Sequence, residues 1–136
     1  MAKKRPKVVK AAAQMWPPIV FDFKGKFTVK KCLREPGVYV LFRDDEPYYV
    51  GKTSKQLFWR IHHHATKPMA RYYHFWNYFS AFVVLNPRHR DEVEGVLIAS
   101  MPTANSATSK IKKIYLPQNV TELMRRMRTG AAKFDE

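Results

Sequence analysis

Cysteine is almost absent from this sequence, since Cys32 is its single occurrence. One cysteine excludes an intrachain disulfide and suits a reducing compartment. Long apolar runs are absent as well, because none approaches the roughly 18 residues that a membrane-spanning helix needs. The N-terminus is basic but lacks the continuous apolar stretch of a signal peptide. We therefore expect a cytoplasmic protein that has no membrane partner.

Acidic residues are scarce, with 11 Asp and Glu against 25 Lys and Arg, which gives a net charge of +14. This excess favours a polyanionic partner such as DNA, because neutralising phosphates releases condensed counterions. A solvated basic surface and attraction to an anionic membrane face are the alternatives. The residues predicted to bind nucleic acid lie near both ends of the chain: Lys3, Lys4, Arg5, Lys7, Lys110, Lys112, Lys113, Arg125 and Arg126.

The length of 136 residues predicts one domain with extensions. We expect a basic N-terminal arm at residues 1–20, mobile without a partner. A folded domain is predicted over residues 21–107, and a basic helical extension over residues 108–136. The sequence shows no internal repeat and no second DNA-binding domain.

Strands are predicted where β-branched and aromatic residues cluster. Residues 38–42 and 48–50 form two such runs around a polar turn, which indicates an antiparallel hairpin. Residues 80–85 predict a third strand. Apolar residues at even spacing predict a short strand or an extended lead-in over 21–29. The expected class is α/β of the α+β kind.

Two helices are predicted inside the domain. The first begins near Ser54, because Thr53 and Gln56 fit a capping box. The second covers residues 91–101, with acidic residues in its first turn and a proline after its end. Together with the strands, they predict a sheet flanked by helices.

Tyr39 and Tyr49 lie on neighbouring predicted strands, so their side chains can converge on one face. A free tyrosine has a pKa near 10, so it acts as a base only where cations stabilise its phenolate. Lys52 and Arg60 are candidates for that role. Alternatively, both tyrosines are core or interface aromatics.

Arg60 and His64 are four residues apart on the first predicted helix and share a face. They can present a guanidinium and an imidazole to one phosphate, or they belong to a basic solvated face. Adjacent histidines point about 100° apart on a helix, so the run at residues 62–64 is a poor zinc site.

The segment Gly51-Lys52-Thr53 is predicted to connect a strand to a helix, where backbone amides and the helix dipole can hold a phosphate. It lacks the spacing of a P-loop. Glu94 lies beside an apolar stripe on the second predicted helix, either as a solvated flank or as a metal ligand. One carboxylate with several waters suits Mg²⁺.

In this order, the motifs resemble those of the GIY-YIG nuclease family, over residues 33–107. The matching positions are Gly37, Val38, Tyr39, Tyr49, Val50, Gly51, Lys52, Thr53, Leu57, Arg60, His64 and Glu94. Val38 and Val50 stand where the family name has isoleucine. The chain is thus similar to a small stand-alone member, and the resemblance implies a three-stranded antiparallel sheet flanked by helices.

The resemblance also implies roles for the site residues. Tyr39 is expected to activate water, and Tyr49 to assist it or hold the phosphate. Arg60 is expected to stabilise transition-state charge, and His64 to position or protonate. The remaining expectations are Glu94 as ligand of one divalent metal ion (Mg²⁺ or Mn²⁺), Lys52 as a helpful cation, and Asn105, Gly51 and Thr53 as supporting residues.

These observations together predict a metal-dependent endonuclease that hydrolyses phosphodiester bonds of DNA. A non-catalytic nucleic-acid-binding protein on the same fold and a sequence-specific, restriction-type dimer are the alternatives. The aromatic residues Tyr72, Tyr73, Phe75 and Trp76 either stack on unpaired bases or pack in the core. Stacking would suit a single-stranded or structured substrate.

Overall fold

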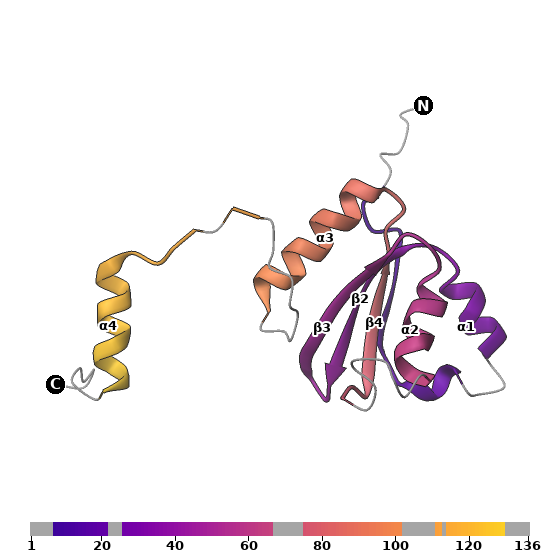
Figure 1. The fold of residues 1–136 in the computed structure, drawn as a ribbon, viewed down its shortest axis with the longest axis horizontal. Coiled ribbons are helices and arrows are strands. Elements are labelled where there is room, and N and C mark those ends of the chain that lie inside the picture. Colours follow the sequence, from indigo (N-terminus) through magenta and orange to yellow (C-terminus); the bar gives the residue numbers. More distant parts are fainter. Residues whose placement is uncertain (1–6, 22–25, 67–74, 102–110, 113, 130–136) are drawn as a thin grey trace.

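Four strands form one antiparallel sheet at the centre of the structure, in the order β1-β4-β2-β3 (Figure 1). A computed structural model describes residues 7–21, 26–66, 75–101, 111–112 and 114–129. The strands are β1 (Ala11–Trp16), β2 (Gly37–Arg43), β3 (Glu46–Thr53) and β4 (Tyr78–Val83). Strands β1 and β3 are therefore the two edges of the sheet.

Five helical segments accompany the sheet. They are the 3₁₀ helix η1 (Pro18–Phe21) and the α-helices α1 (Lys26–Cys32), α2 (Leu57–Thr66), α3 (Pro87–Ser100) and α4 (Gln118–Arg128). Helices α1 and α2 lie to one side of the strands, and α3 lies to the other side (Figure 1). The predicted α/β class and the antiparallel hairpin of β2 and β3 are confirmed.

The side chains of the sheet alternate between two apolar cores, as the pleat of a strand requires. On the side of α1 and α2, Tyr39 and Leu41 of β2 pack with Leu57 and Ile61 of α2. On the side of α3, valines of β2 and β3 pack against α3. The members of this second core are Val38, Val40, Val50 and Val84, covered by Val93, Leu97, Ile98 and others.

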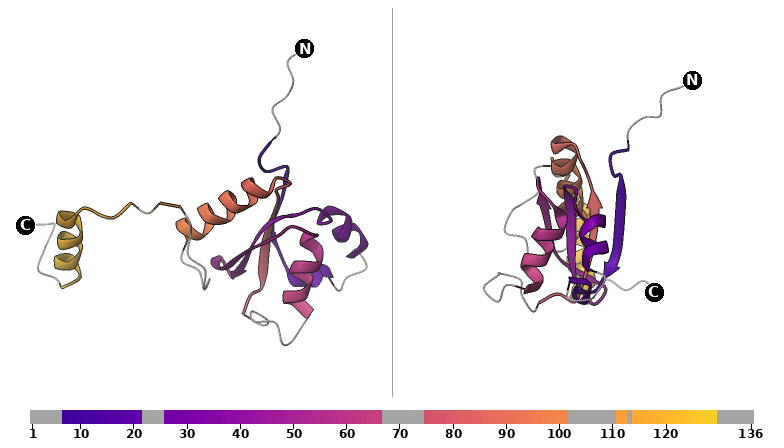
Figure 2. Two further views of the ribbon diagram at one scale, coloured as in Figure 1. Left: turned by 45° about the horizontal axis from the view of Figure 1, so that its top comes forward. Right: turned by 90° about the vertical axis from the view of Figure 1, so that its right-hand side faces the viewer.

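The sheet has one strand more than the sequence predicted. Residues 11–16 were expected in a mobile arm, but they form β1, which pairs with β4 from Ala11 opposite Val83 to Trp16 opposite Phe79. The right-hand view of Figure 2 shows β1 along the edge of the sheet. A bulge interrupts the pairing, and Met15 there has a φ of 53° and donates its N–H to Ser80 Oγ at 3.1 Å.

Two further local predictions were wrong. Residues 18–21 form η1 and residues 26–32 form α1, so the described part of the predicted strand at 21–29 is helical. The capping box is also absent: Thr53 is the last residue of β3, its Oγ1 accepts from the N–H of Lys55, and α2 begins only at Leu57.

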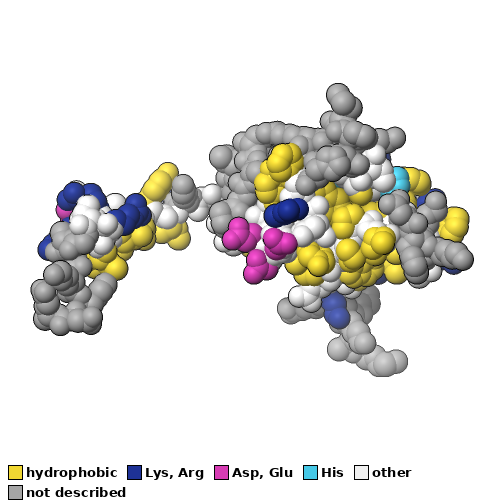
Figure 3. Space-filling model, turned by 90° about the horizontal axis from the view of Figure 1, so that it is seen from below, with side chains coloured by type: hydrophobic (Ala, Val, Ile, Leu, Met, Phe, Trp, Pro, Cys, Tyr) yellow, Lys and Arg dark blue, Asp and Glu magenta, His cyan; other side chains and the backbone are white. Residues whose placement is uncertain are grey.

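Helix α4 lies apart from the sheet in Figure 1 and in the left-hand view of Figure 2, and none of its residues is buried. Figure 3 shows Lys and Arg side chains gathered on it, and a group of acidic side chains at the lower end of the sheet. Among the helices in the described ranges, none has the length and apolar character needed to span a bilayer.

Candidate active site

Strands β2 and β3 place two tyrosines on the α2 side of the sheet. Tyr39 lies opposite Gly51 across the two strands, and Leu41 lies opposite Tyr49. Since cross-strand partners share a face, Tyr39 and Tyr49 both point toward α2. Their ring centroids are 6.2 Å apart. The predicted convergence of the two phenols on one face is therefore what the backbone register produces.

Gly51 makes room for the ring of Tyr39. A β-carbon at position 51 would overlap the Cζ and Oη atoms of Tyr39, so any larger residue there collides with the phenol. Tyr39 is fully buried, with 0% of its surface exposed, and its ring has little space to move aside. Gly51 thus supports the site by its lack of a side chain.

The hydroxyl of Tyr39 is the meeting point of the functional groups on this face. Its Oη lies 2.9 Å from Nε2 of His64. Arg60, one turn earlier on α2, lies close enough to Tyr39 to act on its charge state. A guanidinium can only donate, so its positive charge favours negative charge on the Tyr39 oxygen. The Tyr39 O–H donates to Nε2 when His64 carries its proton on Nδ1, and the Tyr39 oxygen accepts when the proton is on Nε2.

Burial and charge hold these groups in defined protonation states. Burial, reinforced by Tyr49 and opposed by Arg60, raises the pKa of Tyr39 above its ordinary value. The interaction with Tyr39 raises the pKa of Arg60, which stays cationic. At neutral pH the cluster therefore consists of a neutral phenol beside a guanidinium.

His64 is a neutral imidazole in this cluster. Its side chain is nearly inaccessible, with 7% of the residue surface exposed. Burial, together with the charge of Arg60 and the neighbouring His63, lowers the pKa of His64 to about 4. A neutral imidazole keeps one nitrogen able to accept a proton, so His64 can serve Tyr39 as a base.

Position on α2 distinguishes His64 from the two histidines before it. His62 packs its ring against Phe58 and Trp59, and His63 is exposed. Only His64 of the three lies four residues after Arg60 and contacts Tyr39. The four-residue step in the sequence indicated this choice.

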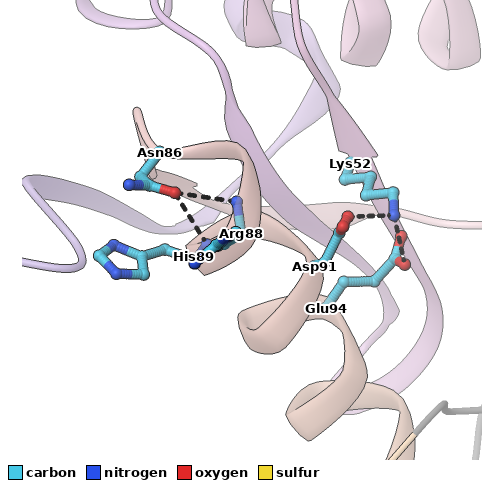
Figure 4. Close-up of polar contacts among 6 residues, drawn as sticks. All are labelled: Lys52, Asn86, Arg88, His89, Asp91 and Glu94. Carbon is cyan, nitrogen blue, oxygen red and sulfur yellow. Dashed lines mark hydrogen bonds and ion pairs between the residues drawn. The ribbon is translucent and has the colours of Figure 1, made fainter.

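Glu94 on α3 belongs to a second group of charges, shown in Figure 4. Lys52 Nζ lies 3.3 Å from Glu94 Oε1 and 2.6 Å from Asp91 Oδ1. The hydrogen bond to Asp91, helped by Glu94, raises the pKa of Lys52. Asp91 was not among the predicted site residues, although its three-residue spacing from Glu94 on a helix is a usable signal.

The two groups lie on opposite faces of the sheet. Tyr39 belongs to the core under α2, whereas Val93 and Leu97, which flank Glu94 in the sequence, pack in the core under α3. Lys52 lies opposite Val38 in the strand register and shares the face of α3. The structure thus brings Tyr39 together with its partners on α2, and Glu94 together with Lys52.

The two groups are connected through neighbouring residues of the edge strand β3. Gly51 lies beneath the Tyr39 hydroxyl, and the next residue, Lys52, reaches Glu94 on the other face. Strand β3 therefore contributes adjacent residues, Gly51 and Lys52, to the two groups.

Residues 51–53 do not form the predicted connection between a strand and a helix. These residues are paired with β2 inside β3, and α2 starts four residues after Thr53. Lys7 and Lys112 are exposed, as are Arg125 and Arg126 on α4. The other predicted residues fall outside the described ranges: Asn105, Lys3, Lys4, Arg5, Lys110, Lys113, Tyr72 and Tyr73.

The remaining aromatic candidates have different environments. Trp76 is buried in the core, as the alternative interpretation expected, while the exposed ring of Phe75 stacks on Tyr48 with centroids 5.9 Å apart. Sequence reasoning also missed Arg90, a buried residue that donates Nη1 to the carbonyls of Val84 and Leu85 and ties α3 to the end of β4.

The carboxylates on α3 fit a hard divalent cation. Within the described ranges, no three His, Cys, Asp or Glu side chains form a metal cage. Mg²⁺ needs fewer protein ligands, usually one or two carboxylates with waters and phosphate oxygens. Glu94 and Asp91 already stabilise one cationic group, the ammonium of Lys52. Their oxygens are also the hard ligands that Mg²⁺ and Mn²⁺ prefer.

Comparison with solved structures gives a structural neighbour. No protein-family model matches the chain, and no curated protein matches it. The structure is similar to the GIY-YIG N-terminal endonuclease domain of UvrC from Thermotoga maritima, a point mutant bound to its catalytic divalent cation. The chains are 27% identical, the match covers 57% of this chain and 91% of that one, and the TM-score is 0.44.

Proposed function

We propose that the protein is an endonuclease that hydrolyses phosphodiester bonds of DNA with the help of a divalent metal ion. The main support is the Tyr39 hydroxyl, which lies 2.9 Å from a neutral imidazole and within electrostatic reach of a guanidinium. Hydrolysis requires a water to lose its proton and a phosphorane to be stabilised by positive charge. The cluster of Tyr39, Arg60 and His64 provides groups for both tasks.

The proton is proposed to move in one relay. The attacking water gives a proton to Oη of Tyr39, while Tyr39 gives its own proton to Nε2 of His64, 2.9 Å away. Arg60 stabilises the phenolate character that develops between the two transfers. A bound phosphate adds negative charge near His64 and so favours its protonated form. Neither step needs a free phenolate in the resting protein.

Arg60 also offers its remaining donors to the phosphorane, since a guanidinium matches two phosphate oxygens. Tyr49 of β3 lies beside Tyr39 of β2 and would hold the phosphate. On the other face of the β3 edge, Glu94 with Asp91 would hold the divalent ion, which supplies positive charge for the phosphate and the leaving oxygen. Lys52 contributes a further cation at that place.

A second candidate is a nucleic-acid-binding protein without catalysis. The observation that favours it is the contact of Lys52 with both Asp91 and Glu94, since an internal ammonium already neutralises the carboxylates that a metal ion would use. In that case the net charge of +14 would account for the whole function.

One experiment separates the two candidates. The purified protein is incubated with end-labelled single-stranded and double-stranded DNA and RNA, with Mg²⁺, with Mn²⁺ and with a chelator. Metal-dependent cleavage of DNA is expected, and Tyr39→Phe should slow it by about 100-fold or more, because the variant lacks only the relaying hydroxyl. Tyr48→Phe, on the neighbouring strand β3, is the matched control and should cleave normally.

Binding of DNA without cleavage under every metal condition would favour the second candidate. Wild-type cleavage that Tyr39→Phe leaves unchanged would contradict the proposed relay.

A further inference from the structure

Side chains of α1 and α2 line an aromatic hollow. One of its lining residues, Trp59, directly precedes Arg60 in the sequence. The hollow has a volume of about 380 Å³, within the range of small-molecule sites. Two elements line it: Phe27 and Lys30 come from α1, and Phe58, Trp59 and His62 come from α2. The fold core does not use this hollow, because its largest rings remain open to solvent.

Exposure of the rings is the unusual property of the hollow. Phe27 is 69% exposed and Trp59 is 52% exposed, although both are large apolar side chains. Phe58 beneath them is buried and holds the indole in an edge-on contact, with centroids 4.9 Å apart. His62 makes a second edge-on contact with Trp59 at 5.6 Å. The exposed ring of Trp59 is thus held in place by the rings of Phe58 and His62.

The two walls of the hollow are also fixed to each other. The N–H of Phe58 donates to the carbonyl of Leu33, just after α1, at 2.8 Å. The N–H of Leu57 donates to the carbonyl of Glu35 at 3.1 Å. A site on two tied elements changes little on binding, so less ordering opposes a ligand.

A cation stands at the rim of the hollow. Lys30 Nζ lies 4.8 Å from the centroid of the Trp59 ring. This distance is typical of a cation–π contact, which attracts a positive group to the indole face. The lysine chain is flexible, so its ammonium can turn to a phosphate when another flat ring covers the indole.

The hollow and the proposed phosphate site share one helix. Trp59 precedes Arg60 directly, and successive residues of a helix point about 100° apart. Around a helix about 10–12 Å across, side chains on adjacent faces end about 10 Å apart. That separation equals about three stacked nucleotides of one strand, and fewer when the strand is extended.

We propose that this hollow binds an unpaired nucleobase of the substrate strand, stacked on Trp59, with Lys30 paired to a flanking phosphate. The assignment rests on the proposed function only for the phosphate at Arg60. Aromatic rings interleaved with basic groups are the usual platform for single-stranded nucleic acid. A base inside a duplex is stacked on both faces and cannot enter, so the preferred substrate is single-stranded or has a flap, bulge or loop.

Tryptophan fluorescence in a chelating buffer tests the platform without cleavage. The probe is a short single-stranded DNA, compared with the same backbone carrying abasic sites. The signal of Trp59 is obtained by subtracting the spectrum of Trp59→Phe, in which Trp16 and Trp76 remain. We expect the base-containing strand to quench Trp59 and the abasic strand to leave it unchanged.

Affinities of variants complete the test. Trp59→Leu should weaken binding of the base-containing strand by about 5- to 150-fold, the usual effect of one lost stacking contact, and should not change binding of the abasic strand. Phe75→Leu, which removes another exposed ring, should bind like the wild type. Equal affinity for the two strands, binding of neither strand, or a loss in Phe75→Leu instead of Trp59→Leu would overturn the proposal.

This outcome is separable from the fate of the proposed function. Stacking on Trp59 without any metal-dependent cleavage would leave a single-strand-binding protein with this platform. Cleavage that depends on Tyr39, without a base-dependent signal from Trp59, would leave the nuclease and remove the platform.

Discussion

At the scale of single residues, Tyr39 connects the chemistry to the fold. Its ring belongs to the apolar core, yet its hydroxyl contacts His64 and lies within electrostatic reach of Arg60. The position and hydrogen bonding of such a buried hydroxyl depend on neighbouring side chains and not on solvent. Substitutions near Tyr39 should therefore change stability as well as activity, and both can be measured separately.

Gly51→Ala should destabilise the protein through Tyr39. The new methyl group collides with the Tyr39 ring, and overpacking of this kind costs about 1–3 kcal/mol of unfolding free energy. In a Tyr39→Leu background the collision partner is gone, so the same substitution should cost much less. Urea denaturation of the four proteins in this double-mutant cycle measures the difference. Equal costs in both backgrounds would show that Gly51 does not serve the ring.

His64 should make stability depend on pH below neutrality. Its pKa is lowered from 6.5 to about 4 in the folded state, so between these values the unfolded chain binds a proton that the folded chain does not. The free energy of unfolding should fall as pH falls through this window, by an amount on the order of 3 kcal/mol at most.

The measurement compares the wild type with His64→Gln, which cannot take up this proton. Urea denaturation at about pH 7 and about pH 5 should show that the wild type loses more stability than the variant. Parallel losses in the two proteins would mean that His64 is not held neutral by burial.

At the scale of elements, the sequence predicted well those parts that local composition determines. The hairpin at β2 and β3 follows from two β-branched, aromatic runs around Asp44 and Asp45. Helix α3 was expected from residue 91, but it begins at Pro87, where Asn86 Oδ1 accepts from the N–H groups of Arg88 and His89. The helix was therefore predicted correctly, but its predicted start was four residues too late.

The missed elements depend on contacts far apart in sequence. Ala11, Ala12 and Ala13 have low strand propensity, and they form β1 only because β4 offers a free edge. The faces of Tyr39 and Glu94 likewise depend on the register between β2 and β3 and on the docking of α3. Neither the register nor the docking could be deduced from motif spacing, which predicted one convergent site.

Nested deletions test β1 as a structural element. Removing residues 1–7 should leave the urea midpoint unchanged, because β1 begins at Ala11. Removing residues 1–16 should lower it clearly, because the deletion takes away the pairing with β4 and exposes the β4 edge. It also removes Ala13 from the core. Two deletions with the same midpoint would contradict the four-stranded sheet.

At the scale of the whole molecule, one group of positive charges lies on α4, apart from the sheet. Helix α4 has Arg125, Arg126 and Arg128 in its last turn, and the helix is exposed throughout. Figure 3 shows these basic side chains at a distance from the acidic group near the sheet. Three exposed acidic residues lie where β2 turns into β3: Asp44 and Asp45 in the turn and Glu46 at the start of β3.

Replacing the three arginines of α4 by glutamine should weaken DNA binding and its dependence on salt. Each phosphate contact adds about 0.9 to the slope of log affinity against log salt for duplex DNA, so the slope should fall by up to about 3. The unfolding midpoint should not change, because no α4 residue is buried. An unchanged slope would mean that α4 does not touch the phosphates.

The central claim is that groups on the two faces of β3 act on one phosphodiester. The direct measurement is the single-turnover rate of DNA cleavage by Arg60→Ala and Glu94→Gln, with DNA affinity measured in a chelating buffer. Both variants should cleave about 100-fold more slowly or worse while their affinities stay within about threefold of wild type. Glu92→Gln, exposed on the same helix, is the control and should cleave normally. Full cleavage by Glu94→Gln, with only Arg60→Ala impaired, would contradict the claim.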